Sequence, residues 1–405
     1  LPPPPLPLQA RQPAPPPAWF VRQQRVNAAL TAAEDAEGVL AVLDSHLGAE
    51  DPDEPPEAAL GSLTYVNVAT ALHRLAKLAP RASRPRLLRD PTFLALEARA
   101  GALGRVPARN AANMLWAFAT LRHAPGEVLW AKLQASFAAD ADHATAQNVS
   151  NALWAAATLG RAPGAEALAA AERRIAEVPE TFLAQNVANS VWAFAKLRPL
   201  AEEGPAAPSG ATLDLLQARA AEIAGTFNPQ NVSNTAWGLA VLGAELAPEL
   251  EAALRARLAD AEFVAGFRVQ NVANALWGLA KLGARLPAAE MAPSLACVAA
   301  KAGDLNAQNC SDLLYAFGAM GYAEGAEMLL EAYVARVDDV APHFAADGLE
   351  GMARLGLRLP DAALERLGQR GVLADAAAED LATVASSLEL AARLKQQGAA
   401  EAAEG

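Results

Sequence analysis

The sequence predicts an all-α protein, an α-solenoid built from tandem helical hairpins of about 38–45 residues. Hydrophobic residues make up 53% of the chain, much of this alanine, whereas aromatic residues make up only 5%. Alanine is the strongest helix former, and strands need more β-branched and aromatic side chains. The second observation is a repeated stretch: QNVSNALWAAATLG (147–160), QNVANSVWAFAKL (185–197), QNVSNTAWGLAVLG (230–243) and QNVANALWGLAKLG (270–283). Repeats of this length indicate helix pairs that bury their apolar faces on neighbouring pairs.

Three parts follow one another along the chain. Residues 1–18 are proline-rich and are expected to be extended. Residues 19–62 hold a segment of helical periodicity (20–48) and an acidic, proline-broken linker, AEDPDEPPE (49–57). Residues 63–405 form the predicted solenoid of eight or nine repeats, the last two degenerate. The second residue of the repeated frame marks these copies at Asn67, Asn110, Asn148, Asn186, Asn231, Asn271, Asn309 and, in the degenerate copies, near Phe344 and Thr383.

Each repeat is expected to contain two helices, the first carrying the repeated frame and the second more variable and charged. Glycine after the frame suits a helix C-terminus, and it occurs at Gly160, Gly243, Gly283 and Gly321. Asn228 and Pro229 are typical of an N-cap followed by the first helical residue. We predict a right-handed solenoid whose first helices line the concave face.

The repeated helix has two predicted faces when its glutamine is numbered 1. Positions 3, 4, 7, 8, 10 and 11 cover one continuous arc and are expected to be buried. This arc includes the position-8 tryptophans Trp116, Trp154, Trp192, Trp237 and Trp277. Positions 2, 5, 6, 9 and 12 fall on the opposite arc, and we expect function on this side.

Three positions of the opposite arc are predicted to bind a ligand. Position 5 carries Asn113, Asn151, Asn189, Asn234, Asn274 and Asp312. Position 6 carries Met114, Ala152, Ser190, Thr235, Ala275 and Leu313, and position 12 carries Lys77, Lys196, Lys281, Arg354 and Arg393. Constant amides beside a variable position and intermittent cations suit single-stranded nucleic acid. Amides and variable residues would contact base edges, and cations would contact phosphates.

Other interpretations of the same residues stay open. The position-2 asparagines could cap their helices locally, and the position-5 asparagines could bond between repeats as a structural ladder. The position-12 cations could simply be solvated side chains whose positive charge stabilises the C-terminus of the helix. From Arg74 to Arg109 inclusive there are nine Lys and Arg and only two acids, Asp90 and Glu97. This basic run could be a solubilising surface.

Charge and residue usage exclude several classes of function. The net charge of −12 and the pI of about 5.0 argue against a polycation that coats duplex nucleic acid. The five histidines are scattered, and Cys297 and Cys310 alone cannot form a zinc site. We find no phosphate loop or nucleophile motif and predict neither an enzyme nor a cofactor. No apolar run approaches the ~20 residues of a membrane helix, so no membrane insertion is expected.

The stretches QNVANALWGLAKLG and VNVATALHRLAKL (66–78) resemble the octotricopeptide repeat proteins of algal organelles, which are similar in turn to FAST-kinase-like mitochondrial proteins. The resemblance covers about residues 63–321 and is weak beyond. It implies an α-solenoid that binds single-stranded organellar RNA sequence-specifically, about one nucleotide per repeat. It also implies a role in transcript stabilisation, processing, splicing or translation, protein partners of organellar gene expression, and a place in the chloroplast or, alternatively, the mitochondrion.

The alternative function belongs to another class. Armadillo-type solenoids use asparagine ladders to hold the backbone of an extended peptide, and an acidic solenoid could bind a basic tail in this way. A pure protein scaffold is the third possibility.

Overall fold

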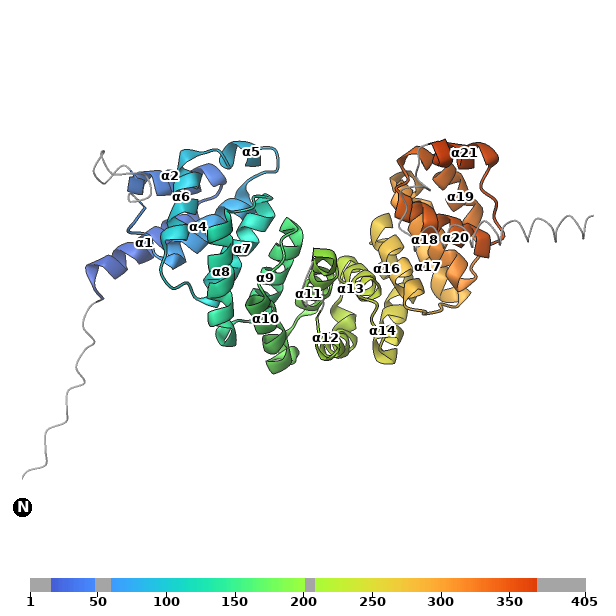
Figure 1. The fold of residues 1–405 in the computed structure, drawn as a ribbon, viewed down its shortest axis with the longest axis horizontal. Helices are drawn as coiled ribbons and strands as arrows, with labels where there is room; N and C mark the ends of the chain where they lie inside the picture. The colour runs from blue at the N-terminus through green and yellow to red at the C-terminus, as the bar shows by residue number, and fades with distance from the viewer. Residues whose placement is uncertain (1–15, 48–59, 201–207, 370–405) are drawn as a thin grey trace, which may run out of the picture. The chain divides into compact units, whose positions relative to one another are not determined.

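The computed structural model describes residues 16–47, 60–200 and 208–369, and these ranges contain helices and no strand (Figure 1). Successive helices pack as a helical-repeat α-solenoid, which confirms the predicted fold class. Contacts divide the chain into two units, residues 1–136 and 137–405, and each is described by itself. The predicted ninth repeat near Thr383, including Arg393, lies outside the described residues, as do positions 1–15.

The first unit holds two N-terminal helices and the first repeats. Its elements are α1 (Ala18–Ala32), α2 (Ala36–Leu47), α4 (Tyr65–Leu78), α5 (Arg84–Leu87), α6 (Pro91–Ala102), α7 (Ala108–Leu121) and part of α8 (Glu127–Ala139). The segment 20–48 is two helices rather than one, because the Asp35 carboxylate accepts a hydrogen bond from the Gly38 amide (2.7 Å) and starts α2. Both helices pack on α4. There Asn67 Nδ2 donates to the Gln23 carbonyl (3.0 Å), so the N-terminal helices cover the face that a preceding repeat would cover.

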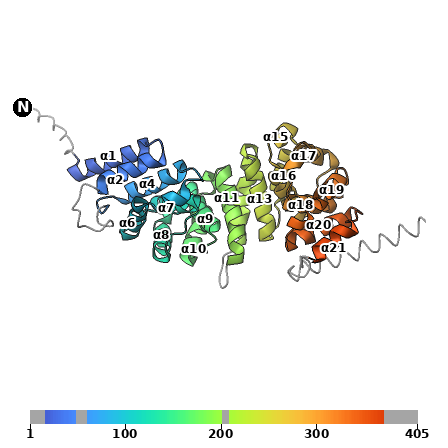
Figure 2. The ribbon, with the colours of Figure 1, turned by 90° about the horizontal axis from the view of Figure 1, so that it is seen from above.

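The second unit contains six further hairpins, which form two layers of helices (Figure 1). The first helices are α9 (Ala146–Leu159), α11 (Ala184–Leu197), α13 (Pro229–Leu242), α16 (Val269–Lys281), α18 (Ala307–Met320) and α20 (Pro342–Arg354). The second helices are α10 (Ala165–Glu177), α12 (Gly210–Ile223), α14 (Pro248–Ala259) with the short α15 (Ala261–Ala265), α17 (Ala288–Ala300), α19 (Ala326–Val334) and α21 (Asp361–Gln369). Neighbouring first helices lie side by side, as α11 and α13 do in both views (Figure 2).

Short 3₁₀ turns return the chain from most second helices to the next first helix, while α15 does so after α14. They are η1 (Ala141–His143), η2 (Pro179–Thr181), η4 (Ala224–Thr226), η5 (Ala302–Asp304) and η6 (Val337–Asp339), while η3 (Arg198–Leu200) extends α11. The predicted helix ends are confirmed. Asn228 accepts from the Asn231 amide (2.9 Å) with Pro229 as the first helical residue. The predicted terminal glycines have φ from +64° to +83°, at Gly160, Gly243, Gly283 and Gly321.

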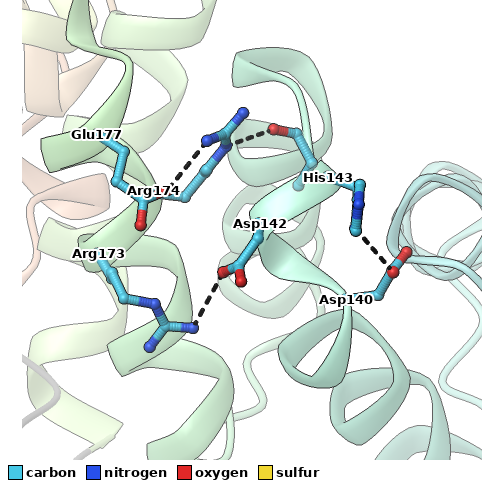
Figure 3. Close-up of polar contacts among 7 residues, drawn as sticks. Asp140, Asp142, His143, Arg173, Arg174 and Glu177 are labelled. Atoms are coloured by element: carbon cyan, nitrogen blue, oxygen red, sulfur yellow. Dashed lines mark hydrogen bonds and ion pairs between the residues drawn. The ribbon is translucent and has the colours of Figure 1, made fainter.

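A basic side chain on the second helix closes several hairpins. Arg174 Nε donates to the carbonyl of Ala144 (2.8 Å), the residue directly before the N-cap of α9 (Figure 3). Equivalent bonds in other hairpins are Arg99 to Leu63, Arg219 to Phe182, Arg257 to Phe227 and Lys301 to Phe267. In Figure 3, Arg173 pairs with Asp142 (3.8 Å) beside the bond of Arg174. Many basic residues therefore bind the protein's own backbone, and Arg99 of the basic run is one of them.

Where position 9 of a first helix in the second unit is glycine, the helix approaches the backbone of the preceding first helix closely. A Cβ added to Gly278 would lie 2.5 Å from the backbone carbonyl carbon of Ala236. One added to Gly238 would lie 2.8 Å from Val191 Cγ1 and 3.0 Å from its carbonyl oxygen. Glycine is therefore required at Gly278 by close approach, because only a shift of the helix backbone would make room for a methyl group.

Gly278→Ala is expected to destabilise the second unit by about 1–3 kcal/mol, since the added methyl group overpacks a backbone contact. Thermal unfolding followed by circular dichroism measures the effect. Gly225→Ala is the control: a Cβ there meets nothing within 4 Å, and we expect a change within about 0.5 kcal/mol. Equal stability of the Gly278→Ala protein and the wild type would contradict the contact.

Candidate nucleic-acid interface

The accessible face of the first helices carries positions 1, 5, 8 and 12, which we call the open stripe. At ~100° per residue, these four positions lie within about 60° of one another on a helix. In α9, α11, α13 and α16 the position-1 glutamines are exposed, and the position-5 asparagines and position-8 tryptophans are half-buried. The exposed glutamines are Gln147, Gln185, Gln230 and Gln270.

The predicted ligand-binding role of position 6 does not agree with the structure, because these side chains are not on the open stripe. Met114, Ser190, Thr235, Ala275 and Leu313 are fully buried, and Ala152 is half-buried. The position-8 tryptophans, expected to be buried, are only half-buried and share the open stripe with the asparagines. The physical reason is that a first helix is covered by neighbouring first helices as well as by second helices. Its buried arc is therefore much wider than that of a helix with one apolar face.

The position-2 asparagines are structural. Asn186 Oδ1 accepts from the backbone N–H of Leu183 (3.1 Å), the N-cap of its helix, so the local capping interpretation is confirmed. Its Nδ2 donates to Ser150 Oγ at position 4 of the preceding repeat (3.0 Å), a bond between repeats that the sequence did not indicate. Asn271 repeats both bonds, with Arg268 N–H (3.3 Å) and Ser233 Oγ (3.1 Å).

Asn309 shows what happens when the serine is missing. Position 4 of the preceding repeat is Ala273, and Asn309 Nδ2 is buried without a hydrogen-bond partner. The asparagine at position 2 therefore joins neighbouring repeats where position 4 of the preceding repeat is serine. The two pairs are Asn186 with Ser150 and Asn271 with Ser233.

The position-5 asparagines differ from those at position 2, although only two residues separate them. Within the described ranges, no hydrogen-bond partner is found for the side chains of Asn113, Asn151, Asn189, Asn234 and Asn274. The structure thus shows no hydrogen-bonded ladder among them. Their half-buried amides retain hydrogen-bonding capacity that a ligand can use.

Position 12 adds exposed cations close to the aromatic rings of the stripe. Lys77, Lys196, Lys281 and Arg354 are all exposed, as predicted for this position. Lys196 Nζ lies 4.8 Å from the ring centroid of Trp237, which is position 8 of the following repeat. In the first unit, His73 occupies position 8 and packs against Trp116, with 4.9 Å between the ring centroids.

An acidic cluster replaces the amides at the C-terminal end of the open stripe. Asp312 and Asp347 occupy position 5 of the last two described repeats. Asp347 accepts from Trp277 Nε1 (2.7 Å) and Lys281 Nζ (2.8 Å). These bonds join α16 to α20 across the intervening repeat of α18, so the first helices form a concave face here, as predicted.

The charges of this cluster depend on one another. Burial, together with the nearby carboxylate of Asp347, raises the pKa of Asp312 to about 7. Burial lowers the pKa of Lys281, but the charge of Asp347 and its hydrogen bond outweigh this, and the net direction is upward. Lys281 Nζ also lies 3.9 Å from the ring centroid of Tyr315.

Among the described residues, no group of three or more His, Cys, Asp or Glu is placed to hold a metal ion. Cys297 and Cys310 are buried free thiols. None of the helices in the described ranges is long and apolar enough to cross a membrane.

Asn186→Ala should destabilise the protein by about 1–3 kcal/mol, because it removes a cap and leaves buried groups without partners. Asn189→Ala, one turn further along the same helix, should change the free energy of unfolding by less than about 0.5 kcal/mol. Chemical denaturation of the two variants measures the difference. Similar losses in both would show that position 5 is structural as well.

Asp312 should make stability depend on pH. Its pKa is about 7 in the folded protein and about 3.9 when unfolded, so the folded state holds an extra proton between these values. The free energy of unfolding should therefore fall as pH rises through this window and level off above it. The stability of Asp312→Asn relative to the wild type should therefore increase by on the order of 2–3 kcal/mol between pH 5 and pH 8. An unfolding-temperature difference between the two proteins that is the same at both pH values would contradict this.

No protein-family model matches this chain, and a search of curated proteins also finds no match. The resemblance to octotricopeptide repeat proteins therefore depends on the repeated residues alone.

Proposed function

We propose that the open stripe binds single-stranded RNA. The observation that carries the proposal is the recurrence, in consecutive first helices, of an unpartnered half-buried amide beside a half-buried indole. Asn151 with Trp154, Asn189 with Trp192, and Asn234 with Trp237 are successive examples in the second unit. The unpaired bases of a single strand are flat rings with polar edges at regular spacing, and such a ligand matches this surface.

The residue types fit the parts of an RNA strand. Unpaired bases stack on aromatic side chains, with a contribution of about 1–3 kcal/mol per base. The amides of position 5 both donate and accept, so they can bond to exposed base edges. Exposed cations such as Lys196 can contact phosphates.

Selectivity between bases is expected where position 12 is uncharged, rather than at position 6. The position-6 side chains are buried except for the half-buried Ala152, whereas position 12 varies between successive first helices. It carries Thr120, Thr158, Lys196, Val241, Lys281, Ala319 and Arg354.

By resemblance, the proposed role extends to organellar gene expression. The protein would act without chemistry of its own, by covering a transcript in its stabilisation, processing, splicing or translation, alone or with protein partners. The chloroplast is the proposed location, with the mitochondrion as the alternative.

One observation favours a second candidate, the binding of an extended basic peptide as in armadillo-type solenoids. Unpartnered amides can also bond to a peptide backbone, and at the end of the stripe the carboxylate of Asp347 already binds a cation, the ammonium of Lys281. The position-12 cations oppose this candidate, because Lys196 would repel a basic segment on the same stripe.

RNA selection tests the proposal directly. The full chain is incubated with a random RNA pool at low salt, and the bound RNA is sequenced. The double variant Asn189→Ala, Asn234→Ala should fold normally and bind selected RNA roughly 10-fold more weakly, through the loss of two hydrogen bonds. Arg173→Gln, which removes a positive charge from the second helix α10, is the control and should leave the affinity within about twofold. Capture of basic peptides without any RNA binding would replace this proposal with the second candidate.

A further inference from the structure

The contact between Trp277, Lys281 and Asp347 shows how the open stripe holds an anion. Trp277 and Lys281 are positions 8 and 12 of α16, one helical turn apart. Each donates to a different oxygen of the same carboxylate, Nε1 to Oδ2 at 2.7 Å and Nζ to Oδ1 at 2.8 Å. Bonds of this kind, with a charged acceptor, are the strong class of hydrogen bond. We call this pair of donors the anion clasp.

The same pair of residues occurs in α11 without an acid. Trp192 is position 8 and Lys196 is position 12 of that helix. Each lysine lies over the position-8 ring of the following repeat: Lys196 Nζ 4.8 Å from Trp237 and Lys281 Nζ 3.9 Å from Tyr315. Lys281 Nζ lies in addition 5.6 Å from the ring centroid of Trp277 on its own helix. Within the described part of the chain, neither the Trp192 indole N–H nor the Lys196 ammonium has a carboxylate partner.

The other first helices with a position-8 tryptophan lack the clasp. Trp116, Trp154 and Trp237 are followed at position 12 by Thr120, Thr158 and Val241. Position 5 in the repeats that follow α11 is Asn234 and Asn274, both uncharged, where the clasp of α16 meets Asp347. Among the described helices, α11 therefore carries the one open clasp.

We infer that Trp192 and Lys196 form a binding site for one backbone phosphate of the RNA strand, an inference that rests on the proposed function. A phosphodiester presents two non-bridging oxygens, as the Asp347 carboxylate presents two oxygens to Trp277 and Lys281. The site anchors the strand at one point and so sets which base meets each amide of the stripe. At α16 the carboxylate occupies the equivalent site, and its charge excludes a phosphate there.

The experiment compares loss of a positive charge at the open clasp with loss of a positive charge on a second helix. Binding of a fluorescein-labelled random RNA pool to the full chain is measured by anisotropy over a range of salt concentrations. Lys196→Gln should weaken binding roughly 3- to 10-fold and reduce the slope of log K against log salt by about 0.7, the value for one phosphate contact on a single strand. Arg173→Gln, which removes a positive charge from the second helix α10, is the control and should change neither quantity. Equal losses in the two variants would overturn the clasp, because any exposed cation would then serve.

Two further variants separate the clasp from general charge effects. Trp192→Phe keeps an aromatic ring and removes the indole N–H, so it should weaken binding and leave the salt slope unchanged. Asp347→Asn should open the second clasp, which would tighten binding and increase the slope by about 0.7. If binding and slope are the same in Asp347→Asn and the wild type, the equivalence of the two sites is wrong.

A second readout separates failure of the clasp from failure of RNA binding. Inorganic tripolyphosphate is titrated into ¹⁵N-labelled protein, and the indole N–H signal of Trp192 is assigned by its loss in Trp192→Phe. The signal should shift in the wild type and not in Lys196→Gln. If the Trp192 signal shifts with tripolyphosphate but the protein binds no RNA, the anion site is supported and the proposed function is wrong. If the protein binds RNA but the Trp192 signal responds to neither tripolyphosphate nor RNA, the clasp is wrong and the proposed function is still supported.

Discussion

The close approach of consecutive first helices is the constraint on which the second unit depends. At Gly278 the contact leaves no room for a side chain, because a Cβ would lie 2.5 Å from the backbone of the preceding helix. Helices this close can exchange short polar contacts, and Asn186 and Asn271 bond to serines of the preceding repeat. Close packing therefore accounts for the small residues and position-2 asparagines of the repeated stretch, and it leaves each first helix one narrow accessible face.

That narrow face explains why part of the fold was predictable and the stripe was not. Repeat length, alanine content and glycine positions are local signals, and they gave the solenoid, the helix pairs and the terminal glycines. The helical phase was misjudged by less than a quarter turn, so the variable residues of position 6 and the small residues of position 9 were placed on the surface. In a stacked array such residues are where helices touch. Only contacts between repeats, such as Asn186 with Ser150, reveal the correct phase, and these join residues far apart in the sequence.

Two chemically identical side chains consequently have different uses in one helix. Asn186 is buried and bonded on both sides of its amide, whereas Asn189 is half-buried and unpartnered. Tryptophan at position 8 moves from the predicted core to the accessible stripe, where it lies beside the amide and the cation. The basic residues divide in the same way: Arg174 and its equivalents close hairpins, while Lys196 remains exposed beside Trp237. Net charge is thus a poor guide to this surface, because a strongly acidic chain still carries a stripe of neutral and basic groups.

Photo-crosslinking of RNA to the full chain, followed by mass spectrometry of the crosslinked peptides, tests the central claim most directly. The account predicts crosslinks at positions 5, 8 and 12 of the first helices, centred on Asn189, Trp192 and Trp237. Crosslinks that map to the second helices α10, α12 and α14, or to the basic segment between Arg74 and Arg109, would contradict it.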